Sequence, residues 1–333
     1  MKRRTTLIAL GAVAILGACA APPSRPSLPV AATYPEYRVP DDLAARRATV
    51  LSEGTPLIAH VLQPRSKAGE RLPTIILCQG TGGLQHYHLA QAFAFARAGF
   101  TAITFDYRGW GESRGRLVPV DMTASPRRDM QPQAVEAMEV RETVDPAEQT
   151  RDVMAMIAWA AGEPETDAAR IGLWGTSLGA AIAAEATILE PRVRAAVLQV
   201  GPYDLRQGGA AAERIFAEAG RRARGDLPYP RPAPRIPGAL HGHRVSENYQ
   251  TFSPLEDLTR LAGRSAQPAI LVIDAEYEEL FDNRQHGQRF FERLRAPKDR
   301  VIIPWIKHYD IYRGDPLRQA VRHAVDWYER HLK

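Results

Sequence analysis

The stretch IGLWGTSLGAAIAAEA, residues 171–186, joins two patterns of different period. A short apolar run at residues 171–174 is typical of a buried strand, and the alanine-rich run at residues 178–189 favours a helix. Between them lies G-T-S-L-G, in which glycines flank Ser177 and let the backbone pass close to itself. A serine on such a strained strand-to-helix turn has its hydroxyl exposed in a cleft. The stretch therefore predicts Ser177 as a nucleophile.

A second G-x-S-x-G match occurs at residues 111–115 and contains Ser113. This serine lies several residues beyond the apolar run at residues 100–105, and the sequence after it, R-L-V-P, does not begin a helix. A motif of this kind is a hypothesis until its structural context agrees. The context predicts a loop here, so Ser113 is not expected to be the nucleophile.

Short apolar runs and helical patterns alternate along the rest of the chain. Strands are predicted at residues 74–78, 100–105, 171–174, 193–200, 269–273 and 301–306. Helices are predicted at residues 84–98, 147–161, 178–189, 282–294 and 317–331. This alternation predicts the α/β class, with a doubly wound, mostly parallel sheet and helices on both faces.

Two segments interrupt the alternation, at residues 115–144 and 206–267. The second contains a predicted helix at residues 210–224 and the proline-dense stretch LPYPRPAP at residues 227–234. Long excursions between core strands are rarely idle in a compact domain. We expect both insertions to form a cap or lid over the site; the alternative is a surface loop.

The N-terminus has the layout of an export signal. A basic start is followed by an apolar run at residues 7–16 and by L-G-A-C, which ends at Cys19. The run is too short to span a bilayer. Small residues before a cysteine resemble the lipobox of bacterial lipoproteins, which implies a signal peptide at residues 1–18 and lipidation of Cys19. The alternative is a plain signal peptide that is cut near Ala18 or Ala20.

The predicted lipoprotein has a proline- and alanine-rich tether at residues 19–44 and a folded domain at residues 45–333. Its expected location is the cell envelope, where the lipid anchors it to a membrane that faces the periplasm. Cys78, the only other cysteine, lies in an apolar run and is expected to pack in the core. The net charge of +5 falls to about +2 without residues 1–18, and no basic stripe indicates a nucleic-acid partner.

Four motifs occur in a fixed order: QGTGG at residues 79–83, DYRGWGES at residues 106–113, GTSLG at residues 175–179 and HYDIY at residues 308–312. In this order they resemble the α/β-hydrolase superfamily, in particular a bacterial branch with dienelactone-hydrolase-like and peptidase-like members. The resemblance covers about residues 45–333. It implies a serine hydrolase with a catalytic triad.

A serine hydroxyl needs a base within hydrogen-bond reach. His308 follows the last predicted strand at the carboxyl edge of the sheet, where α/β folds bind ligands, and the resemblance selects the same residue. The third member should be a carboxylate after the strand at residues 269–273. The resemblance favours Glu278 at a position where Asp is more usual. Four acids nearby stay open as alternatives: Asp274, Glu276, Glu279 and Asp282.

An oxyanion hole needs two N–H donors. One is expected from the backbone of Leu178, which follows the nucleophile at a helix N-terminus. The resemblance implies a second from the turn at residues 80–83, with Thr81 as the best candidate. Gln79 stands where the family usually has His.

No metal or cofactor is expected. Two H-x-H pairs occur, His86 with His88 and His241 with His243, but neither has a third ligand at useful spacing. Phosphate-binding and dinucleotide-binding motifs are absent from the sequence.

The expected function is hydrolysis of an ester or related acyl bond in a small-molecule substrate, through an acyl-enzyme. An acyltransferase or a peptidase with the same triad is the alternative. A non-catalytic envelope lipoprotein is a third hypothesis.

Overall fold

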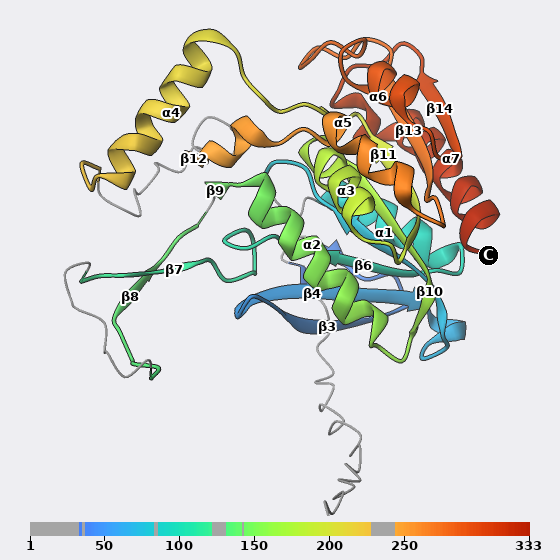
Figure 1. The fold of residues 1–333 in the computed structure, drawn as a ribbon. Helices are drawn as coiled ribbons and strands as arrows, with labels where there is room; N and C mark the ends of the chain where they lie inside the picture. The colour runs from blue at the N-terminus through green and yellow to red at the C-terminus, as the bar shows by residue number, and fades with distance from the viewer. Residues whose placement is uncertain (1–32, 35–36, 83–85, 122–130, 142, 228–243) are drawn as a thin grey trace, which may run out of the picture.

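The computed structural model describes residues 33–34, 37–82, 86–121, 131–141, 143–227 and 244–333 (Figure 1). Its centre is an eight-stranded sheet in the order β14-β13-β11-β10-β5-β6-β4-β3. In chain order, these strands are β3 (Leu43–Ser52), β4 (Thr55–Pro64), β5 (Leu72–Cys78), β6 (Thr101–Phe105), β10 (Thr166–Thr176), β11 (Val193–Gln199), β13 (Ala269–Ala275) and β14 (Lys298–Ile303).

The six strands from β14 to β6 are parallel, as predicted, and β10 lies among them between β5 and β11. The doubly wound α/β fold predicted from the sequence is therefore confirmed. At one edge, β4 pairs antiparallel with both β6 and β3. The β3–β4 hairpin was not predicted, although its turn contains Gly54 with a φ of 85°.

Helices cover both faces of this sheet. Every residue of β5 is buried, and its side chains alternate between two cores. Ile76 and Cys78 face the core that α2 (Pro146–Ala161) and α3 (Leu178–Leu189) close. Ile75 and Leu77 face the core that α1 (His86–Arg97) and α7 (Gly314–Leu332) close. Strands buried on both faces read as continuous apolar runs, which is why the sequence shows them clearly.

Most elements differ from their predicted bounds by a few residues, and for two of them the structure shows a physical reason. The helix expected at residues 282–294 is the shorter α6 (Gly287–Arg293), because a turn in which Asp282 binds Arg284 precedes it. The strand expected at residues 301–306 is β14, which begins at Lys298 and ends at Ile303. Pro304 has no N–H to continue the ladder, and the next residue, Trp305, has a φ of 62°.

The two insertions meet beside α2. The first contains β7 (Leu117–Pro119), β8 (Ala137–Glu139) and β9 (Thr143–Val144), and the second contains α4 (Gly209–Ala223), β12 (Arg244–Val245), η3 (Glu247–Thr251), α5 (Pro254–Asp257) and η4 (Leu258–Gly263). Strand β9 pairs with β12, which joins the insertions. Figure 1 shows β7, β8 and α4 extending to one side of the sheet. That they act as a cap stays a prediction.

The predicted signal peptide, Cys19 and the part of the tether up to residue 32 lie outside the described residues. Two short paired strands, β1 (Thr33–Tyr34) and β2 (Tyr37–Arg38), precede the main sheet. None of the helices in the described part of the chain has the length and apolar character needed to cross a membrane.

Candidate active site

Ser177 lies on the sharp turn between β10 and α3. Its backbone has φ 54° and ψ −128°, an uncommon conformation for a residue other than glycine. Its N–H donates to the carbonyl of Gln199 on β11 at 2.9 Å, which holds the turn against the next strand. A Cβ on Gly179 would lie 2.2 Å from the carbonyl oxygen of Cys78, so only glycine fits there. Strained residues of this kind are common at functional sites.

His308 lies in the loop between β14 and α7 and contacts Ser177. Its Nε2 is 3.1 Å from the Oγ of Ser177. On the other side of the ring, Nδ1 is 2.8 Å and 3.0 Å from the two carboxylate oxygens of Glu278. The side chains of His308 and Glu278 are each only 1% exposed. The structure thus brings together the three side chains that the sequence analysis selected, in a hydrogen-bonded series.

The acids near Glu278 have different partners. Glu279 accepts the backbone N–H of His308 at 2.8 Å and so helps to hold the loop rather than the ring. The other three bind away from the imidazole: Asp274 to the guanidinium of Arg300, Glu276 to the backbone N–H of Trp305, and Asp282 to Arg284. Burial raises the pKa of Asp274. Of the five acids, Glu278 has the position of an orienting carboxylate.

The turn at residues 80–82 lies against Ser177. A Cβ on Gly80 would be 3.3 Å from the Cβ of Ser177 and 4.0 Å from its Oγ. The next residue, Thr81, is half-buried. Leu178 begins α3, so its N–H lies at a helix N-terminus. Both predicted oxyanion donors are therefore on segments beside Ser177.

Gln79, which replaces the histidine usual in the family, is fully buried. Neither its amide oxygen nor its amide nitrogen has a hydrogen-bond partner within the described residues. Buried amides usually have partners. Among the described residues, its side chain therefore provides no hydrogen bond that holds the turn.

Ser113 is fully buried and lies in a loop, as the sequence predicts. Its hydroxyl donates to the carbonyl of Asp106 at 2.6 Å and accepts the N–H of Ile58 at 2.9 Å. The first bond lies within the loop, and the second ties the loop to β4 of the β3–β4 hairpin. Ser113 thus has a structural role.

The described residues of the two histidine pairs form no metal site. His88 is buried, with edge contacts to the rings of Trp174 and Tyr312 at centroid distances of 6.0 Å and 5.7 Å. The side chain of His86, and all of His241 and His243, lie outside the described residues. Elsewhere among the described residues, no group of three His, Cys, Asp or Glu could hold a metal ion. That the protein needs no metal or cofactor stays a prediction.

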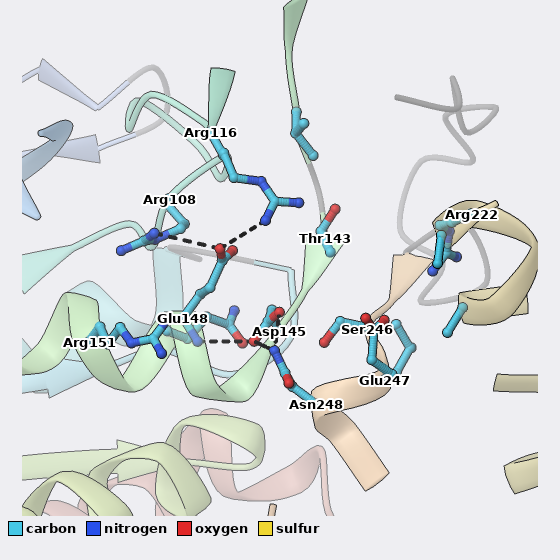
Figure 2. A pocket seen from close by; sticks show the side chains of 15 residues that line it. Arg108, Arg116, Thr143, Asp145, Glu148, Arg151, Arg222, Ser246, Glu247 and Asn248 are labelled. Atoms are coloured by element: carbon cyan, nitrogen blue, oxygen red, sulfur yellow. Dashed lines mark hydrogen bonds and ion pairs between the residues drawn. The ribbon is translucent and has the colours of Figure 1, made fainter. Parts of the chain in front are cut away.

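A cavity of about 480 Å³ lies apart from these residues, between the N-terminus of α2 and the C-terminus of α4 (Figure 2). Asp145 caps α2 there by accepting the N–H groups of Ala147 and Glu148, and it also binds Asn248 of η3. The charged lining residues are Arg108, Arg116, Asp145, Glu148, Arg151, Arg222 and Glu247. Arg116 is paired with Glu148 inside the cavity, and Arg108 with Asp152 behind it. The walls are nearly balanced in charge and favour neither cations nor anions.

Three residues that surround the elbow were not predicted from the sequence: Thr176, Gln199 and Tyr312. The hydroxyl groups of Thr176 and Tyr312 are 2.8 Å apart, and the amide of Gln199 donates to Thr176 at 3.2 Å. Tyr312 ends the HYDIY motif and Thr176 precedes the nucleophile, but no local pattern reveals that these distant residues meet.

The doubly wound sheet, the elbow after β10 and the histidine loop after β14 together define an α/β hydrolase. A family model agrees: that of the X-Pro dipeptidyl-peptidase (S15) family matches residues 53–297. The chain therefore belongs to this family of α/β hydrolases.

The chain is also similar to individual proteins. A 31.7 kDa Escherichia coli protein of the traX-finO intergenic region is 39% identical over 158 residues, which is 46% of this chain and 44% of that protein. The chain thus aligns with less than half the length of this relative. Thiohydrolase apmlB of Arthrinium phaeospermum is 31% identical over 244 residues, which is 63% of this chain and 72% of the relative. The solved structure of the alpha/beta hydrolase GrgF from Penicillium sp. sh18 has a TM-score of 0.65 at 20% identity, and the match covers 87% of this chain and 99% of that one.

Proposed function

We propose that the protein is a serine hydrolase that cleaves an ester, thioester or related acyl bond through an acyl-enzyme. The observation that carries the proposal is the continuous series Glu278–His308–Ser177, with contacts of 2.8 Å and 3.1 Å. The similarity to a protein named a thiohydrolase agrees with chemistry at an acyl–heteroatom bond.

In this mechanism, Glu278 accepts a hydrogen bond from the N–H at Nδ1 of His308, and this holds the tautomer in which Nε2 is free to take the proton of Ser177. The Oγ of Ser177 attacks the carbonyl carbon, and the N–H of Leu178 and the backbone near Thr81 stabilise the oxyanion. The imidazolium then protonates the leaving group. A water molecule, activated by the same imidazole, releases the acid and restores the serine.

The test is turnover of p-nitrophenyl acetate and butyrate by the wild-type protein and by Ser177→Ala. The wild type should hydrolyse at least one ester, and Ser177→Ala should lose at least about 10³-fold in kcat. Full activity in Ser177→Ala would refute the proposal.

Two other acyl reactions use the same triad. The family match favours peptide cleavage as a second candidate, and hydrolysis of an Xaa-Pro-p-nitroanilide that greatly exceeds ester hydrolysis would support it. Acyl transfer is distinguished by adding alcohols or amines as acceptors and measuring how the acyl group partitions between them and water.

We also propose that the protein is exported and attached to a membrane through a lipid on Cys19. The motif L-G-A-C supports this location. The full-length protein should fractionate with membranes, and Cys19→Ala should fractionate away from them. Equal membrane retention of both would contradict the proposal.

A further inference from the structure

We propose that Tyr312 and Thr176 form a positioning pair that sets the distance between the base and the nucleophile. The inference rests on the proposed function, because it assigns a role in the reaction that Ser177 and His308 perform. Neither residue would touch the substrate. Each would act through the catalytic residue that is near it in the chain.

The pair bridges the two segments that carry the catalytic side chains. Thr176 is the last residue of β10, directly before Ser177, and Tyr312 is the last residue of η5 (Asp310–Tyr312), which follows His308. Their hydroxyl groups are 2.8 Å apart. This bond and the 3.1 Å contact between Ser177 and His308 thus join the same two segments side by side.

The segment from His308 to Tyr312 is compact, so a shift of one end is passed to the other. The N–H of Asp310 donates to the carbonyl of Lys307 at 3.1 Å, and the carboxylate of Asp310 accepts the N–H of Lys307 at 3.1 Å. The rings of His308 and Tyr312 also pack, with centroids 6.2 Å apart. Tyr312 therefore fixes the loop that presents the imidazole.

Thr176 is also held by Gln199 of β11. The side-chain amide of Gln199 donates to the hydroxyl of Thr176 at 3.2 Å, and its backbone carbonyl accepts the N–H of Ser177 at 2.9 Å. Thr176 and Gln199 are almost completely buried, and Tyr312 is only 7% exposed. Shielded from water, the network connects β11, the elbow and the histidine loop.

A positioning pair of this kind requires the hydroxyl group of Tyr312 for full catalytic rate. Tyr312→Phe retains the ring that packs on His88 and His308 and removes only the oxygen that binds Thr176. Displacements of about 1 Å between reacting groups can lower rates by as much as about 100-fold. We therefore expect Tyr312→Phe to lower kcat by about tenfold with little change in KM.

Tyr328→Phe is the matched control. The hydroxyl of Tyr328 is also buried and also binds β10, since it donates to the carbonyl of Leu173 at 2.6 Å, but it is not attached to the histidine loop. Rates are expressed per serine titrated with a fluorophosphonate probe, so that misfolded protein does not count. Both variants should unfold at lower denaturant concentrations than the wild type, and only Tyr312→Phe should lose kcat.

The threonine provides the reciprocal test. Thr176→Val removes the hydroxyl at nearly constant shape, and with it the acceptor of the Gln199 amide, so it should be at least as slow as Tyr312→Phe, whereas Thr176→Ser retains the hydroxyl and should recover most of the rate. The double variant Thr176→Val/Tyr312→Phe should be no slower than Thr176→Val alone, because Thr176→Val already removes the bond to Tyr312.

Equal kcat for Tyr312→Phe and Tyr328→Phe, or additive losses in the double variant, would overturn the pair. These outcomes are distinct from failure of the proposed function, which would appear as a wild-type protein with no ester turnover and no labelling at Ser177.

Discussion

Glu278 presents both carboxylate oxygens to Nδ1 of His308, at 2.8 Å and 3.0 Å, within a pair of side chains that are each 1% exposed. The contact directs Nε2 of the ring toward Ser177, since the N–H at Nδ1 donates its hydrogen bond to the carboxylate and keeps the proton. Glutamate is one methylene longer than the aspartate usual in the family, and the loop of residues 274–282 accommodates this length.

The first prediction concerns Glu278. Glu278→Gln should lower kcat/KM by about 10³-fold, because the amide neither stabilises the imidazolium nor fixes its tautomer. Glu279→Gln is the control, since its amide oxygen can still accept the N–H of His308, and its loss should stay within about tenfold. Equal losses in the two variants would contradict the role assigned to Glu278. The measurement is steady-state turnover of a p-nitrophenyl ester.

The second prediction separates Ser113 from Ser177. Ser113→Ala leaves the N–H of Ile58 without its partner in a buried position, which should lower the free energy of unfolding by about 2 kcal/mol. Activity per folded molecule should not change. Urea unfolding and ester turnover measure the two quantities. A variant of normal stability without activity would show that the serines had been assigned wrongly.

The third prediction concerns Glu185, on the helix α3 that follows Ser177. Burial and, to a smaller extent, the charge of Asp257 raise its pKa to about 7 against the opposing charge of Arg260, and one carboxylate oxygen has no partner within the described residues. Because the folded state favours the protonated form, the stability from this group is full below the unfolded pKa of about 4.3 and is lost as pH rises through about 7.

Glu185→Gln should remove this dependence. Relative to the wild type, the variant should gain up to about 3 kcal/mol of unfolding free energy between pH 4 and pH 8. Urea unfolding at several pH values measures the difference. A difference that is constant across this range would contradict the assigned titration.

The fourth prediction tests the close packing of the elbow. A Cβ at Gly179 would lie 2.2 Å and 2.4 Å from the carbonyl oxygens of Cys78 and Gln79, both of them backbone atoms. Gly179→Ala should therefore cost about 3 kcal/mol of stability or prevent folding. Gly208→Ala is the control, because a Cβ there meets nothing within 4 Å and φ is −104°. Similar stability for the two variants would show that the elbow is not tightly packed.

The parts of the fold that could be predicted are those whose pattern lies within one continuous stretch of sequence. The elbow is encoded in one continuous stretch, and α3 has the predicted bounds, Leu178–Leu189. The β3–β4 hairpin has a weaker signal, since β3 includes Arg46 and Arg47 and lacks a clean alternation of buried and exposed residues. Its position at the sheet edge depends on pairing with β6, which is distant in the chain.

In the candidate site, too, contacts between residues that are distant in the chain could not be predicted from the sequence. The sequence alone left five acids as candidates for the third member of the triad, and the resemblance selected Glu278. The geometry separates them because each carboxylate binds a different group. The contact between Thr176 and Tyr312 joins residues 136 positions apart, and such contacts arise only from the assembled sheet.

Labelling with a fluorophosphonate, followed by mass spectrometry of the modified peptide, tests whether Ser177 is the activated nucleophile. We predict one modified residue, Ser177, and at least a 100-fold slower reaction in His308→Ala, because the imidazole no longer takes the serine proton. Modification of another residue, or unchanged labelling of Ser177 in His308→Ala, would contradict the proposal.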